Sequence, residues 1–346
     1  MIKTDINPLK LFQRLRGFAF LSLALFVLAQ SVECREPTPL KVYIREVLYD
    51  SLKKILPTSF PLTKQKSKHA KVPQRRSIEW IPLSEARLYA RLKLEGDETP
   101  ADVVVGLASD AVPEIKASPF PAELRENLHF PFQWKNRNFL PLYYGYLSIV
   151  YNAKKISVPS QSLWELVDVK TDESLIFPDP HTSSTGFGFV AWLIESLPQA
   201  NQSNWDILKT KVKATPASED FANTFFHKGQ ASLIVSYTTS TLYHRQNKET
   251  YIKAILFPEG NPLHVFVAFK TLKAAQDSDA DALLRILTSA DIQTAIASKF
   301  WMYPVLESVM TEDLINLPKP DKIFVPRIRS RQTILDRWQT LMGQVG

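Results

Sequence analysis

Two runs of hydroxyl residues follow apolar, strand-like segments and have the chemistry to bind a small ligand. The first lies in Ser174–Leu193, SLIFPDPHTSSTGFGFVAWL, and a shorter echo lies in Ser232–Gln246, SLIVSYTTSTLYHRQ. In each, a buried strand is expected to lead through Ser and Thr into a helix. Such residues cap helices, and the first backbone N–H groups of a helix are free to bind acceptors or anions. One such turn is ordinary, whereas two favour a binding site.

The elements that position these turns alternate between strands and helices along the chain. Alternation of this kind indicates an α/β fold built on parallel sheets, with the ligand beyond the carboxyl ends of the strands. Two long, β-prone segments, 140–152 and 255–267, bracket the middle region and are predicted to cross between two lobes. Strands are also expected at 40–49, 78–81, 101–107, 174–177 and 232–237, and helices at 51–56, 84–95, 162–167, 187–197, 204–212, 219–227, 270–276, 280–289 and 290–298.

The N-terminus has the pattern of an export signal. Four basic residues precede the apolar run Gly17–Ala29, which is too short to span a bilayer comfortably but suits a secretory signal. Ala29-Gln30-Ser31 fits a cleavage site, so residues 1–31 are interpreted as a signal peptide and the protein is expected in the periplasm. Cys34 is the only cysteine. Because Glu33 does not fit a lipoprotein signal, we expect cleavage without lipid; anchoring at Cys34 is the alternative.

The net charge of +7 comes from two short stretches of the chain. Residues 1–31 contribute +3 and the stretch 64–76 contributes +6, which leaves −2 for the rest of the chain. A nucleic-acid-binding protein would spread basic residues over a face and interleave aromatic ones, so we expect no nucleic-acid partner. The basic stretch is interpreted as a solvated loop, with contact to anionic lipid as the alternative.

The chain lacks the spacings that mark metal or catalytic sites. Its six histidines show no H-x-x-x-H pattern, so we expect no metal and no cofactor. The sequence contains no G-x-S-x-G, phosphate-binding loop or dinucleotide fingerprint. The S-x-x-K match at Ser51–Lys54 lacks the motifs that accompany it in acylating enzymes. No catalytic residue is therefore predicted.

Five segments, in order, resemble the thiamine-binding subunit of bacterial ABC importers. The resemblance runs from about Leu40 to about Trp338, and the SYTTS and WMYPV elements are its most specific parts. It implies a type II periplasmic-binding-protein fold, an α/β fold of two lobes with two crossover strands. We expect lobe 1 at 36–140, lobe 2 at 141–262, and a return to lobe 1 with C-terminal helices at 263–346. The segments are ADVVVGL (101–107), LPLYYGYLSIVYN (140–152), FPDPHTSSTGFGF (177–189), KGQASLIVSYTTSTLYH (228–244) and FWMYPV (300–305).

The resemblance also implies ligand-binding residues. The family's contacts in its DP-x-T-S-T turn correspond to Ser183 and Ser184. Its Y-T-T-S run corresponds to Tyr237, Thr238, Thr239 and Ser240, and the tryptophan of W-M-Y-P corresponds to Trp301.

At four places the chain departs from the family pattern. The family's Asp-Gly corresponds to Ser84-Glu85, its Tyr-Asp to Arg45-Glu46, one Trp to Ala217, and its Asp-Tyr-Gly-Tyr to Tyr143–Tyr146. We expect Glu85 to replace the missing acid and hold a ligand cation. Arg45 has the geometry to bind a phosphate through two hydrogen bonds, which would favour thiamine phosphates over thiamine. A surface ion pair is the simpler interpretation of Arg45, and core packing is the simpler one for Trp301.

We therefore expect an exported, monomeric solute-binding protein rather than an enzyme. It would capture thiamine or a thiamine phosphate between two lobes and deliver it to an inner-membrane ABC permease. Binding of another solute by the same fold, ferric ion or an organic anion, is the alternative. A thiamine-processing enzyme is disfavoured, because such enzymes resemble this fold but use a Cys nucleophile, and the single Cys lies beside the signal cleavage site.

Overall fold

The computed structural model describes residues 38–61, 75–126, 128–131, 133–327 and 330–343. The predicted signal peptide, Cys34 and residues 64–74 of the basic stretch lie outside these ranges. Within them, no helix combines the length and the apolar character needed to cross a membrane.

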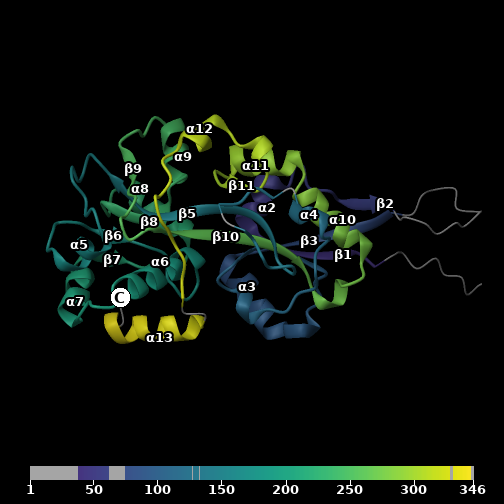
Figure 1. The fold of residues 1–346 in the computed structure, drawn as a ribbon, viewed down its shortest axis with the longest axis horizontal. Coiled ribbons are helices and arrows are strands. Elements are labelled where there is room, and N and C mark those ends of the chain that lie inside the picture. Colours follow the sequence, from purple (N-terminus) through teal and green to yellow (C-terminus); the bar gives the residue numbers. More distant parts are fainter. Residues whose placement is uncertain (1–37, 62–74, 127, 132, 328–329, 344–346) are drawn as a thin grey trace, which may run out of the picture. The chain divides into compact units, whose positions relative to one another are not determined.

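The first part of the fold surrounds three parallel strands, β3-β1-β4 (Figure 1). Helix α3 lies on one side of these strands and α11 on the other. All three strands have buried residues, and every residue of β4 is buried. The elements are β1 (Leu40–Arg45), α2 (Glu46–Leu52), β2 (Ser59–Pro61), β3 (Arg75–Leu83), α3 (Glu85–Glu95), β4 (Val103–Ala108), α4 (Glu123–Glu126) and β5 (Leu140–Asn152).

The middle of the chain forms a second parallel set, β7-β6-β8. Its largest helix, α6, is buried along most of its length, and α13 packs against α6 and α7. The elements are α5 (Leu163–Asp168), β6 (Leu175–Ile176), α6 (Ser184–Ser196), α7 (Gln202–Lys211), β7 (Val212–Ala214), α8 (Glu219–His227), β8 (Leu233–Tyr237), α9 (Ser240–Gln246) and β9 (Ile252–Ala254).

The last part of the chain returns along β10. The elements are β10 (Asn261–Lys270), α10 (Ser278–Leu287), α11 (Ala290–Lys299), β11 (Tyr303–Pro304), α12 (Glu312–Asn316), β12 (Ile323–Phe324) and α13 (Arg331–Met342). Trp338 of α13 packs edge-on against Phe177 and Trp205, with ring centroids 5.8 and 6.5 Å away. These contacts join the end of the chain to its middle region.

Two long strands connect the parallel sets. The first half of β5 pairs with β10 and its second half pairs with β8, while β10 also pairs with β4. This confirms the two-lobe α/β fold with crossover strands. The parallel pairing expected from the alternation of strands and helices is present in both sets, whereas β4, β10, β5 and β8 pair antiparallel with one another at the centre. A strand that returns from one lobe to the other necessarily runs against the strand that left.

Several helices and strands begin or end at other residues than the sequence predicted. The strand expected at 40–49 ends at Arg45, and the helix expected at 51–56 instead spans Glu46–Leu52. Leu48 and Leu52 are buried on one face of that helix at the i, i+4 spacing, which outweighs the β-prone composition. The helix expected at 270–276 is a short 3₁₀ turn, Leu272–Ala274, because β10 continues to Lys270.

The N-terminus of α6 packs too tightly for any residue but glycine at position 186. A Cβ atom on Gly186 would lie 1.9 Å from the carbonyl oxygen of Pro178. We expect Gly186→Ala to lower the free energy of unfolding by about 2 kcal/mol or more, because backbone must shift to make room. Denaturant unfolding measures this loss.

Gly188→Ala is the matched control two residues along the same helix. Its Cβ would lie 3.3 Å from a Leu147 methyl group, which a small rotation relieves, and Ala favours the helix by up to about 1 kcal/mol. Equal unfolding midpoints for the two variants would contradict the packing argument.

Candidate functional site

A buried guanidinium lies between two carboxylates at the carboxyl end of β1. Arg45 is only 5% exposed, and its Nη2 lies 3.3 Å from Glu85 Oε2 and 3.2 Å from Glu219 Oε2. The guanidinium also lies 4.9 Å from the ring centroid of Phe266 in β10. Glu85 begins α3, before the first crossover strand, and Glu219 begins α8, after it. The ion pairs therefore connect parts of the chain on either side of the crossover.

The N-terminus of α6 faces the same cluster. Ser183 caps the helix by accepting a hydrogen bond from the Gly186 N–H, and the Ser184 N–H donates to Glu85 Oε1 at 3.1 Å. The Thr185 hydroxyl donates to the Glu219 carboxylate. The sequence predicted that N–H groups at this helix start would be free to bind a ligand. In the structure, the Ser184 N–H already donates to a carboxylate of the protein itself. The buried Ser184 hydroxyl has no hydrogen-bond partner among the described residues.

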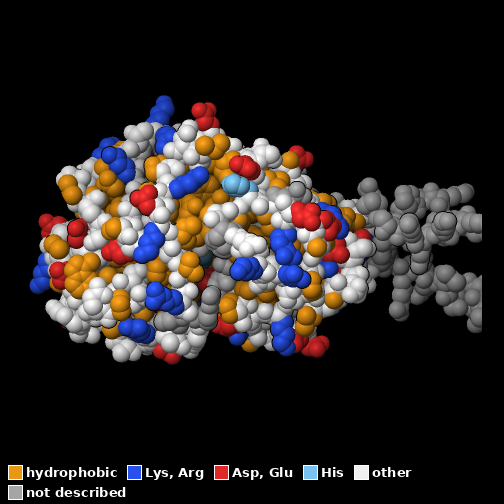
Figure 2. Space-filling view, in the orientation of Figure 1, with side chains coloured by type: hydrophobic (Ala, Val, Ile, Leu, Met, Phe, Trp, Pro, Cys, Tyr) orange, Lys and Arg blue, Asp and Glu red, His pale blue; other side chains and the backbone are white. Residues whose placement is uncertain are grey.

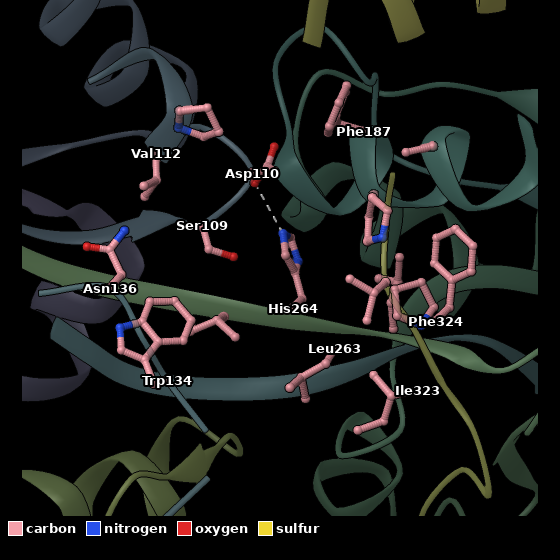
Figure 3. Close-up of a pocket in the computed structure, with 18 residues that line it drawn as sticks. Ser109, Asp110, Val112, Trp134, Asn136, Phe187, Leu263, His264, Ile323 and Phe324 are labelled. Atoms are coloured by element: carbon pink, nitrogen blue, oxygen red, sulfur yellow. Dashed lines mark hydrogen bonds and ion pairs between the residues drawn. The ribbon is translucent and has the colours of Figure 1, made fainter. Parts of the chain in front are cut away.

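A chain of polar contacts extends from this cluster through β8 and β10. The Tyr237 hydroxyl lies 3.0 Å from Thr185 Oγ1 and 2.9 Å from His264 Nδ1. His264 Nε2 lies 3.4 Å from Asp110 Oδ1, and the two side chains point toward one another in Figure 3. Asp110 in turn binds the Arg331 guanidinium, which also donates to the Pro180 carbonyl oxygen at 2.9 Å.

Burial and these partners shift the pKa values of the cluster. Burial raises the pKa of Glu85, and this effect outweighs the opposing charge of Arg45. Burial alone would lower the pKa of Arg45, but the charges of Glu85 and Glu219 raise it. Burial likewise would raise the pKa of Asp110, but the hydrogen bond with His264 and the charge of Arg331 lower it. Arg45 therefore stays charged, while the pKa of Glu85 lies above its usual value.

The two larger cavities at this chain of contacts are lined by some of its residues. The cavity beside Arg45 has a volume of about 330 Å³, and its lining includes Ser84, Glu85, Ser183 and Glu219. The other, about 560 Å³, is mostly apolar. Figure 3 shows its lining side chains, which include Trp134, Phe187, Leu263, His264 and Phe324. On the face drawn in Figure 2, the basic side chains of the described residues are dispersed among acidic and apolar ones.

The structure gathers about half of the predicted site residues into one place. Arg45, Glu85, Ser183, Ser184 and Tyr237 meet in the cluster, and Ser84 lines its cavity.

The other predicted residues point elsewhere. Thr238 lines a separate cavity of about 360 Å³, and Thr239 Oγ1 lies 3.9 Å from Met302 Sδ. Ser240 donates to the Tyr237 carbonyl oxygen, and Trp301 packs against the apolar cluster that contains Tyr303 and Leu242.

Sequence reasoning missed Glu219, Thr185, His264, Asp110 and Arg331. Glu219 carried a usable signal, because Ser218-Glu219 repeats the Ser-Glu helix start of Ser84-Glu85. Asp110 follows a buried strand in an acceptor-rich turn, which is a second usable signal.

Comparison with known proteins agrees with this architecture. The sequence model of the bacterial extracellular solute-binding proteins matches residues 79–301. The thiamine-binding periplasmic protein of Salmonella typhimurium is 33% identical over 266 residues, which cover 74% of this chain and 81% of that protein. Its counterpart in Haemophilus influenzae is 30% identical over 281 residues, which cover 77% and 83%.

Solved structures give the same picture. A periplasmic thiamin binding protein superposes with a TM-score of 0.73 at 28% identity, covering 88% of this chain and 96% of that one. Iron-bound HitA from Pseudomonas aeruginosa superposes with a TM-score of 0.66 at 17% identity, over 90% and 100%, and shares the fold. The chain belongs to the bacterial extracellular solute-binding proteins, within the family of the thiamine-binding periplasmic proteins.

Proposed function

We propose that this protein captures thiamine as a cation in the cleft beside Arg45 and delivers it to an ABC permease from the periplasm, without chemical change. The observation that carries the proposal is the pair of half-buried carboxylates, Glu85 and Glu219, which share a single buried guanidinium. The names of the relatives supply the ligand, since they are called thiamine-binding periplasmic proteins. We also propose that the protein works as a monomer.

The charge around the cavity supports a cationic ligand. Four carboxylates, those of Glu46, Glu85, Glu219 and Asp220, line it together with two guanidiniums, so the formal charge of the lining is −2. A cation in a cavity of low dielectric gains from the excess negative charge, whereas a phosphate is repelled by it.

In the sequence, Arg45 suggested a preference for thiamine phosphates. The contacts of Arg45 in the structure instead support a preference for free thiamine, which we propose here. Arg45 is held by two carboxylates, and the N–H of Ser184 is held by Glu85. A phosphate would have to displace carboxylates from both donors.

The remaining predicted contacts stay part of the proposal. Tyr237 presents its ring next to the cluster, and Thr238, Thr239 and Ser240 follow it in the turn that begins α9. Trp301 is half-buried and has a φ of 53°, a left-handed backbone conformation that is costly for a side chain of this size. Strain of this kind gathers at ligand sites, which favours a role for Trp301.

Opening and closing of the cleft would accompany capture. Two contacts beside the cleft join a residue of the assigned lobe 1 to a residue of the assigned lobe 2: Arg45 with Glu219, and Glu85 with Ser184. We propose that these contacts separate to admit the ligand and that the lobes, assigned as 36–140 with 263–346 and 141–262, close again around it.

Calorimetric titration of the ligand-free mature protein tests the ligand and the role of Arg45 together. We expect thiamine to bind at least about tenfold more tightly than thiamine monophosphate or diphosphate, a difference of ~1.4 kcal/mol. Arg45→Gln should strengthen thiamine binding by about tenfold or more, because the thiazolium no longer shares the two carboxylates with an internal cation.

Arg87→Gln is the matched control, since Arg87 lines the same cavity but is exposed, so the change in net charge is the same. It should alter the affinity by less than about threefold. Weaker thiamine binding by Arg45→Gln would show that Arg45 contacts the ligand directly. A preference for phosphorylated forms that Arg45→Gln abolishes would restore the phosphate interpretation, and a response only to another solute would overturn thiamine as the ligand.

The raised pKa of Glu85 predicts that thiamine uptake releases protons. Burial raises the pKa of Glu85 in the free protein, and an arriving cation favours the carboxylate, so binding lowers this pKa and releases protons at pH values near it. Thiamine affinity should therefore fall as the pH is lowered through the raised pKa. Titrations in two buffers of different ionisation enthalpy measure the protons released, and Glu85→Gln should remove the release due to this carboxyl. Release that is unchanged in Glu85→Gln would assign it to another group.

A further inference from the structure

Two histidines and a glutamate lie close together near the C-terminal ends of α8 and α9. His227 is the last residue of α8, His244 lies in α9, and Glu249 lies in the turn that leads to β9. One nitrogen of each imidazole and one carboxylate oxygen all lie within 4.8 Å of one another. The His227 and His244 ring centroids are 5.1 Å apart, and His244 Nδ1 lies 2.7 Å from Glu249 Oε2.

This cluster differs from the surroundings of the other described histidines. His129, His181 and His264 each pair with one carboxylate, that of Glu307, Asp179 and Asp110 respectively. Among the described residues, only His227, His244 and Glu249 form a group of three or more candidate metal ligands. Two imidazoles and a carboxylate are the donor set of many zinc sites, with a water molecule in the fourth position.

The parts of the cluster have complementary properties. His244 is 5% exposed, and the hydrogen bond between its Nδ1 and Glu249 Oε2 fixes the orientation of its ring. Glu249 is tied to the same turn, because its own N–H donates to the His244 carbonyl oxygen at 2.8 Å. His227 is exposed at the end of its helix, so its side chain is free to rotate toward a metal and to leave room for its entry.

We propose that His227, His244 and Glu249 form a site for a divalent transition-metal ion of the zinc type. Ligand atoms bound to one zinc ion lie about 3.3 Å apart, so a modest rotation of the His227 imidazole completes the site. The metal would tie the C-terminal end of α8 to α9. Helix α8 begins at the proposed ligand cleft, at Glu219, so the ion would hold the far end of this helix against α9 without entering the cleft.

Zinc titration of the untagged mature protein, read against a competing chromogenic chelator, tests the site. We expect one ion per chain with a dissociation constant of about 1 µM or lower. His227→Ala should weaken binding by about tenfold or more and leave folding intact, because the side chain is exposed. Cobalt(II) substitution gives a second readout, since a histidine-bound ion in a tetrahedral site absorbs visible light and His227→Ala should abolish that band.

His129→Ala is the matched control, because it removes an exposed histidine that has a carboxylate 3.5 Å away but, among the described residues, no second imidazole in a metal-type group. Zinc affinity should be unchanged in this variant. Failure to bind one equivalent, or equal affinity in His227→Ala and the unaltered protein, would overturn the proposal. A loss in His129→Ala as large as in His227→Ala would show adventitious binding by surface histidines.

Discussion

The buried contact of Arg45 with Glu85 and Glu219 is the constraint on which the centre of the molecule depends. A guanidinium removed from water is tolerated only when carboxylates and hydrogen bonds compensate for the lost hydration. Here the compensation comes from the first residues of two helices, α3 and α8, which fixes where both helices begin. The same requirement draws the start of α6 into the cluster, through the N–H of Ser184.

The crossover strands make this arrangement possible. Strands β5 and β10 connect the two parallel sets of strands, so the carboxyl ends of β1 and β4 come to face the starts of α6 and α8. His264 of β10 then links Tyr237 with Asp110, and Asp110 reaches Arg331. A single line of polar contacts thus passes from α8 through β8 and the crossover strand β10 to the final helix, and Glu219 at one end and His264 and Asp110 further along it line the two cavities.

The excess carboxylate charge separates this protein's chemistry from that of a phosphate-binding protein on the same fold. Helix N-termini commonly bind phosphate, yet at α6 the place is taken by Glu85. On the function proposed here, the cleft is suited to cations, and the protein's own guanidinium lies where part of the ligand's positive charge would lie. The two histidines near the C-terminal ends of α8 and α9, with Glu249, form a metal-type donor set that shares no residue with this cleft.

The sequence by itself was sufficient to predict the export signal, the α/β class, the crossover strand at 140–152 and the family. These predictions depend on periodicity, turn residues and short motifs, which are local properties of a sequence. It also identified Arg45 and Glu85 as departures from the family pattern. Only the tertiary structure decided that Arg45 pairs with Glu85, 40 residues away, and with Glu219, 174 residues away. Nor did any spacing indicate that His227 meets His244 and Glu249. Such meetings depend on how helices are oriented when their apolar faces pack, and no local pattern in a single sequence encodes that orientation.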